Sequence, residues 1–388
     1  MNDLLTADQI SIRDSIARIC SEFGPDYWLQ RDEDGQFPKE FHRRIADGGW
    51  LGITLPVEYG GAGLGVTEGA LMMQAIAQSG AGFTGASAIH GYLFAPKPIA
   101  LFGTDEQKRR MLVPLIEGKD IAAFGVTEAD AGLDTTNIKT MAVRKGDRYV
   151  INGNKMWTSL GQRATKYMIL ARTTPKADVR KPTDGMTLFF TDFDRSRIEA
   201  REIHKMGRKA IDSNAVFIDG LEVPVEDRIG EEGKGFQYLL DGLNPERILI
   251  AAGAIGLGRA ALRRATDYAK ERVVFGRPIG QNQGIQHPLA RCHMELEAAN
   301  LMVFRAAALY DRGEPCGPEA NAAKYLGAEA GFRACETAVM THGGMGYAKE
   351  FHVERYMREI MIARLAPVSR ELILCHVAEK VLGLPKSY

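Results

Sequence analysis

The first apolar residues of the chain recur at helical spacing. Isoleucines at positions 12, 16 and 19 and a phenylalanine at 23 would lie on one face of a helix. Thr6 stands three residues before Gln9, which is the spacing of a capping box that begins such a helix. Shorter helical patterns continue to about residue 120, interrupted by the glycine-rich sequence YGGAGLG. We therefore expect a helical domain over residues 1–120.

The pattern changes near residue 121 and changes back near residue 231. The sequences YVINGNKMWTS, MTLFFTDF and AVFIDGLEVPV are rich in β-branched and aromatic residues, which is typical of strands, and turn sequences separate them. We expect an antiparallel β domain over residues 121–230. A helical period then returns, and it repeats around 281–312, 318–341 and 369–381, which predicts a C-terminal bundle of four or five long helices over residues 231–388. This order places the fold in the α+β class.

Charge and composition exclude several classes of protein. Lysine plus arginine equals aspartate plus glutamate at 49 each, and no basic block is present, so a nucleic-acid interface is not expected. No run of 18 apolar residues and no secretory signal occurs, so we expect no membrane span. Five cysteines without a Cys-x-x-Cys pair indicate reduced thiols. We expect a bacterial cytoplasmic protein, or a processed mitochondrial matrix protein if the source is eukaryotic.

Common chemical motifs are absent or lack their context. Neither of the glycine clusters, GGAGLG and GAIGLG, lies between a predicted strand and a predicted helix. Neither therefore predicts a dinucleotide-binding turn. No His-Glu-x-x-His pair, zinc-ligand spacing or Gly-x-Ser-x-Gly elbow occurs. We predict no metal site, and we interpret His204, His287 and His293 as surface or satisfied interior histidines.

Four motifs in a fixed order carry a family resemblance. FGVTEADAGLD at 124–134, NGNKMWTSLG at 152–161, ERVVFGRPIGQNQGIQ at 271–286 and HGGMGYAKEF at 342–351 together resemble the acyl-CoA dehydrogenase family of flavoproteins over essentially the whole chain. The resemblance implies oxidation of an acyl-CoA thioester to the trans-2-enoyl-CoA by an FAD held between the β domain and the C-terminal bundle. It also implies an electron-transfer flavoprotein as electron acceptor, and a homotetramer or homodimer.

The resemblance implies contacts to both ends of the cofactor and to the substrate. Residues placed at the flavin ring and ribityl chain are Phe124, Val126, Thr127, Trp157, Thr158, Ser159, Ser369 and Glu371. Residues placed at the adenosine diphosphate part, across a subunit boundary, are Arg272, Phe275, Asn282, Gln283, Met340, Gly343 and Gly344. Substrate positions are Leu133, where a serine usually contacts the CoA arm, together with Asn244 and Arg247.

The resemblance also implies an alternative position for the catalytic base. Most family members carry a glutamate in a YEGT segment near the C-terminus, but the matching stretch LAPVSRE has Pro367 there. Members similar to isovaleryl-CoA and long-chain acyl-CoA dehydrogenases carry the glutamate before an arginine on the first long helix of the bundle, where this chain has Glu246 and Arg247. We predict that Glu246 removes the α proton, with its pKa raised from about 4.3 toward roughly 6 to 7 by exclusion of water.

Pro367 and its neighbour also depart from the family pattern. Proline has no backbone N–H to polarise the thioester carbonyl, and Val368 replaces the usual glycine. Either the register slips by one residue here, or the flavin ribityl hydroxyl carries more of the polarisation.

Other interpretations of the same residues stay open. Asn244, Pro245 and Glu246 would also suit an N-cap, a first helical residue and a first-turn acid, although the helical pattern before them favours Pro245 inside a helix. His90 lies in the stretch 85–96 expected to line the acyl pocket, and we expect it to pack rather than contact substrate. The fold would also suit an acyl-CoA oxidase, a desulfinase, a flavin monooxygenase or a helical scaffold without catalysis.

Overall fold

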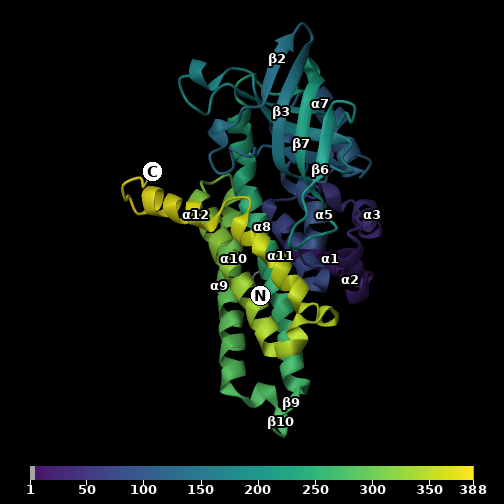
Figure 1. Ribbon diagram of the computed structural model, residues 1–388, viewed down its shortest axis with the longest axis vertical. Helices are drawn as coiled ribbons and strands as arrows, with labels where there is room; N and C mark the ends of the chain where they lie inside the picture. The colour runs from purple at the N-terminus through teal and green to yellow at the C-terminus, as the bar shows by residue number, and fades with distance from the viewer. Residues whose placement is uncertain (1–4, 388) are drawn as a thin grey trace.

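The computed structural model describes residues 5–387 and shows a β sheet at one end and a long helical bundle extending from it (Figure 1). The elements follow the order helical, β, helical, so the predicted α+β class is confirmed. The sequence GAIGLG lies inside a helix and GGAGLG lies in a loop, so neither forms a nucleotide-binding turn.

Seven helices form the N-terminal part of the described chain. Their bounds are α1 Ala7–Ser21, α2 Pro25–Asp34, α3 Lys39–Asp47, α4 Val66–Ile76, α5 Gly82–Phe94, α6 Lys97–Phe102 and α7 Asp105–Ile116. The predicted capping box is confirmed: the Thr6 hydroxyl accepts from the Gln9 backbone N–H at 3.2 Å, and the Gln9 side chain accepts from the Thr6 N–H at 3.1 Å.

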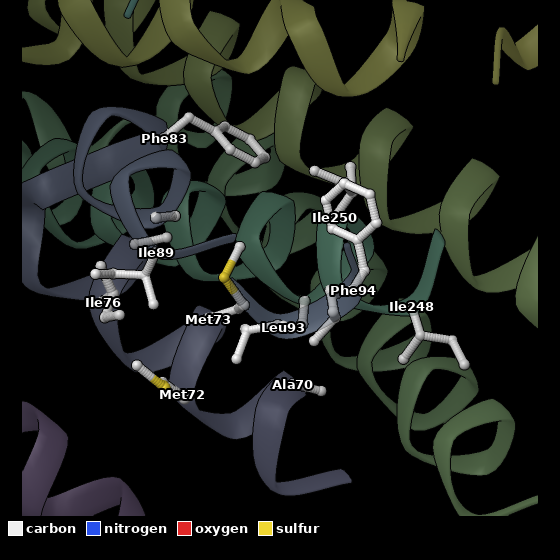
Figure 2. Packing of buried hydrophobic residues seen from close by; sticks show 14 of the residues in the cluster. Ala70, Met72, Met73, Ile76, Phe83, Ile89, Leu93, Phe94, Ile248 and Ile250 are labelled. Atoms are coloured by element: carbon white, nitrogen blue, oxygen red, sulfur yellow. The ribbon is translucent and has the colours of Figure 1, made fainter. Parts of the chain in front are cut away.

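Helices α4 and α5 are buried along most of their length. They pack against the first helix of the bundle, and Figure 2 shows their apolar side chains in one cluster with Ile248 and Ile250 of that helix. The apolar core therefore runs continuously from the N-terminal part into the bundle, which fixes α5 relative to the helix that carries Glu246.

The central part is an eight-stranded sheet in the order β6-β7-β3-β2-β4-β5-β8, with β1 added beside β4. The bounds are β1 Ala122–Gly125, β2 Met141–Lys145, β3 Arg148–Ser159, β4 Lys166–Arg172, β5 Met186–Asp192, β6 Ile198–Glu202, β7 Ser213–Pro224 and β8 Arg228–Ile229. Most pairs are antiparallel as expected, but β1 runs parallel to β4, and β2 meets β4 in parallel at Met141 and Arg172. Strand composition alone does not reveal these pairings, because they depend on the loops that cross between strands.

The C-terminal part has three long helices and two shorter ones. Helices α8 Gly235–Glu271, α9 Gln283–Asp311 and α10 Gly317–His342 form the bundle, and a short hairpin of β9 Val273–Val274 and β10 Arg277–Pro278 joins the first two. Helix α11 Val353–Leu365 was not predicted, and α12 Arg370–His376 is shorter than expected. The prediction of four or five long helices was therefore wrong, because only three of these five helices are long.

Three further features concern residues 5–387. None of these helices combines the length and the apolar composition that crossing a membrane requires. All five cysteines are free thiols, and four of them are buried. No group of three or more His, Cys, Asp or Glu residues in this part of the chain is arranged to hold a metal ion.

Candidate active site

Glu246 lies inside helix α8, which continues without a break through Pro245. Asn244 is also helical, so the interpretation of Asn244 as an N-cap is wrong. Its Oδ1 accepts a hydrogen bond from Nη1 of Arg247 at 2.8 Å. The Nε atom of Arg247 is buried and has no partner among the described residues, so Arg247 keeps a donor free for a bound molecule.

The electrostatic surroundings of Glu246 favour its neutral form. Its side chain is only partly exposed and makes no hydrogen bond or ion pair within residues 5–387. Burial raises the pKa of Glu246 to about 7, while the positive charges of Arg247 and Lys324 oppose that rise. A carboxyl group with this pKa exchanges a proton readily at neutral pH, as a general base must.

Lys324 connects the surroundings of Glu246 to the segment around Pro367. Its side chain is fully buried in α10, and its Nζ donates to the carbonyl oxygens of Ala363 and of Val368, the latter at 2.9 Å. Burial lowers the pKa of Lys324 to about 8, and the charge of Glu246 raises it. The ammonium group therefore interacts electrostatically with Glu246 and is hydrogen-bonded to the residue that follows Pro367. Sequence analysis missed Lys324, whose only signal was a lone cation in the alanine-rich stretch 318–331.

Replacing Lys324 by methionine is expected to shift the pH dependence of the enzyme upward. Without the positive charge, the pKa of Glu246 should rise further. The carbonyls of Ala363 and Val368 also lose their donor, at a cost of about 1–3 kcal/mol for each buried acceptor. The rate of flavin reduction measured against pH tests the shift, and Lys119→Met, which removes a surface lysine, is the control. A Lys324→Met profile at or below the wild-type midpoint would contradict this electrostatic role.

A buried ion pair between Lys155 and Glu128 stabilises the segment after β1. Lys155 Nζ donates to the Val126 carbonyl at 3.1 Å and to Oε1 of Glu128 at 2.9 Å, and both side chains are almost fully buried. The Thr127 carbonyl accepts from the N–H of Met156 at 2.8 Å. These bonds bring residues 124–127 beside residues 157–159, so two of the predicted flavin segments lie together.

Trp157 and Thr158 differ in orientation because β3 changes register there. A register shift between Lys155 and Thr158 leaves Trp157 at φ 62° with 57% of its surface exposed, as a β-bulge does. Thr158 is fully buried, and its hydroxyl makes no direct hydrogen bond by distance and angle among the described residues, although it interacts with the hydroxyl of Tyr167. Ser159 pairs with Ser213 of β7. An exposed aromatic ring beside a buried hydroxyl with remaining hydrogen-bonding capacity fits a planar polar ligand such as a flavin.

Ser369 and Glu371 lie at the start of α12. The Ser369 hydroxyl accepts from the N–H of Leu372 at 3.2 Å and caps the helix, and Glu371 pairs with Arg370 at 2.6 Å on the surface. Both follow the segment that Lys324 binds. Leu133 is 56% exposed in the loop between β1 and β2.

The residues predicted for the adenosine diphosphate part lie at the opposite end of α8. Glu246 is separated from the hairpin by about 38 Å of continuous helix, and Figure 1 shows the hairpin far from the sheet. Arg272 is exposed there and Phe275 is fully exposed at φ 51°. Within one chain, these residues are therefore not brought together with the flavin-ring residues.

A shallow recess lies between the start of α9 and the end of α10, near this hairpin. It has a volume of about 260 Å³ and is lined by residues that include Gly284, Ile285 and Met340, next to Asn282 and Gln283. A Cβ atom built on Gly343 or Gly344 would meet no atom within 4 Å, so the backbone there is open to a close approach. Within one chain, this recess and the flavin-ring residues lie at opposite ends of α8.

The fold and these groups define a three-part flavoprotein oxidoreductase. Three family models match the chain: the acyl-CoA dehydrogenase N-terminal domain at residues 6–119, the middle domain at 123–221 and the C-terminal domain at 233–382. The chain belongs to the acyl-CoA dehydrogenase family and is an enzyme of this kind, and the family uses FAD.

Curated and solved relatives agree with this assignment. The chain is 38% identical to acyl-CoA dehydrogenase fadE12 of Mycobacterium bovis, with 97% of each chain covered. It is 31% identical to butyryl-CoA dehydrogenase from Megasphaera elsdenii, with 97% and 99% covered and a TM-score of 0.92. A chain in the structure described as the electron transferring flavoprotein of Acidaminococcus fermentans is 32% identical, with 98% and 100% covered and a TM-score of 0.91.

Proposed function

We propose that the enzyme oxidises an acyl-CoA thioester to the trans-2-enoyl-CoA with Glu246 as the catalytic base. The observation that carries this proposal is a carboxyl group inside α8 whose pKa burial raises to about 7 and which forms no ion pair with any residue of 5–387. Glu246 takes the proton from the α carbon, and the electron pair of that C–H bond forms the new C=C bond as the β hydrogen leaves with its own electron pair. Bound FAD supplies the two-electron acceptor for that hydride.

The other predicted residues take supporting roles in this proposal. The free Nε donor of Arg247 binds the CoA arm or its neighbourhood, and the open ring of Trp157 and the buried hydroxyl of Thr158 bind the flavin. Because the hairpin residues lie too far from the ring site of their own chain, a second copy supplies them, and the enzyme is a homodimer or homotetramer. The likeness to the Acidaminococcus chain supports an electron-transfer flavoprotein as the acceptor.

Anaerobic reduction of the bound flavin by acyl-CoA thioesters tests this function. The second-order rate of bleaching should rise about tenfold per pH unit at low pH and level off above a midpoint near 7, because only the ionised form of Glu246 accepts a proton. A panel of straight, branched and aromatic thioesters would identify the acyl group. A flat profile between pH 5 and 9 would contradict the assignment of Glu246. Rapid reoxidation by air would identify an oxidase instead.

A further inference from the structure

One side of helix α5 carries a stripe of two polar residues and a phenylalanine that leads to the proposed flavin site. Ser87, His90 and Phe94 follow one another at intervals of three and four residues, so they lie on one side of the helix. The ring of His90 lies 4.6 Å from that of Phe94, which in turn lies 5.3 Å from Phe124 of β1 in an edge-to-face contact. The stripe thus begins beside the predicted flavin segment and runs away from it.

Arg208 reaches this stripe from the loop between β6 and β7. Its Nη1 donates to the Ser87 hydroxyl at 3.0 Å, and it forms no ion pair within residues 5–387. The one carboxylate whose charge acts appreciably on Arg208 is Glu359. Glu359 is already bound by the backbone N–H and hydroxyl of Thr84 at 2.9 and 2.7 Å and by Arg355 at 3.1 Å. Arg208 is therefore partly buried, without a carboxylate of its own within residues 5–387.

Two neighbours, His90 and Lys205, add an unpartnered ring nitrogen and a second cation to this region. The Nε2 atom of His90 is buried and has no hydrogen-bond partner among the described residues. Burial and the charge of Arg208 lower the pKa of His90 to about 3, so the ring is neutral at physiological pH. Lys205 adds a second partly buried cation near Arg208. Acidic groups that act on Lys205 are Glu202 and Asp212, and Asp212 already bonds to Gln162 and Asn214.

The helix also leaves room next to the polar groups. A Cβ atom built on Gly91 would meet no atom within 4 Å, although most residues around it in α5 are buried. Gly91 follows His90 directly and lies one helical turn beyond Ser87, on the same side. Open space one helical turn from the serine that binds Arg208 is where a ligand group can enter.

We propose that Arg208, with Ser87 and His90, binds a carboxylate at the far end of the acyl group, so that the substrate class is an acyl-CoA with a terminal carboxyl group. This inference rests on the proposed function. A partly buried charge is stabilised by a partner of opposite sign, and the planar fork of arginine matches the two oxygens of a carboxylate. Neutral imidazole and hydroxyl groups add donors without adding charge. The expectation that His90 only packs does not explain its unpartnered nitrogen.

Matched pairs of thioesters test the proposal in anaerobic stopped-flow reduction of the holoenzyme. Each pair has the same chain length and ends either in a carboxyl or in a methyl group: glutaryl against valeryl, adipoyl against hexanoyl, and suberyl against octanoyl-CoA. At the fitting length, the carboxyl-ended thioester should have a half-saturation concentration about 10- to 100-fold lower than its partner, the range for a charge-assisted hydrogen bond. Arg208→Gln should reduce this ratio to near one.

Lys209→Gln is the matched control, because Lys209 points to the Glu33 carbonyl instead, and it should keep the wild-type ratio. Absorbance of the bound flavin shows whether each variant is folded. If Arg208→Gln does not fold, the wild-type panel still shows whether the enzyme prefers carboxyl-ended thioesters. Methyl-ended thioesters that bind as well as their partners at every length would overturn the proposal, and so would an Arg208→Gln protein that keeps the preference. Failure of every thioester to bleach the flavin would overturn the proposed function itself.

Discussion

Replacing Glu246 by glutamine is expected to slow anaerobic flavin reduction by about 10²-fold to 10⁴-fold, the range for loss of a positioned general base. Glutamine keeps the size of the side chain but cannot accept a proton at neutral pH. The flavin should remain bound, because no predicted FAD contact depends on Glu246. Stopped-flow absorbance at saturating acyl-CoA measures the rate. Asp267→Asn, which alters an exposed carboxyl group of the same helix, should leave the rate unchanged.

Glu246→Gln should also be at least as stable as the wild type above neutral pH. The pKa of Glu246 is raised from 4.5 to about 7 by folding, so its contribution to stability is full below the unfolded pKa and is lost as pH rises through about 7. At pH 8 the wild type holds a partly buried charge that the glutamine lacks. A variant that reduces its flavin at the wild-type rate would exclude Glu246 as the base, and thermal unfolding at pH 8 separates lost chemistry from lost folding.

The fold class was accessible from sequence because its signal is local: the hydrophobic period separates the helical and β parts. The Glu–Arg pair alone did not identify Glu246, because the same pair recurs at 271–272 and 354–355. The position of Glu246 within the family resemblance identified it. Pro245 could also be placed inside a helix, since the apolar spacing continues across it, and α8 confirms this. The role of Glu246 stays a prediction, because only its surroundings are observed.

The buried cations could not be predicted for a physical reason. In a regular strand, alternation would turn Lys155 and Trp157 to the same face, and composition would favour burying the tryptophan. The register shift in β3 instead leaves Lys155 buried and Trp157 exposed. Lys324 and Arg208 are likewise held by carbonyl and hydroxyl groups from distant segments, and no local pattern encodes those partners.

The second large effect is expected for Lys155→Met. Glu128 would keep its buried position but lose its counter-charge, and removing one partner of a buried ion pair costs about 3–5 kcal/mol. Burial alone would raise the pKa of Glu128, yet Lys155 and hydrogen bonds from residues 139 and 140 hold it below its usual value. The Val126 carbonyl would also lose its donor. We therefore expect lower stability together with weaker FAD binding, measured by thermal unfolding and by flavin retained after gel filtration.

Lys166→Met is the control variant: it shows whether losing an exposed ion pair of the sheet has the same effect as losing the buried pair. Lys166 pairs with Asp192 at the surface, where Asp192 is 78% exposed, and exposed pairs contribute about 0–1 kcal/mol. The Lys166→Met protein should therefore unfold near the wild-type temperature and keep its flavin. If Lys155→Met did the same, the segment 124–127 would not depend on the buried pair, and the flavin contacts proposed for it would need another support. Loss of stability with full flavin retention would limit the pair to a structural role, because the strand would then keep its shape without Lys155.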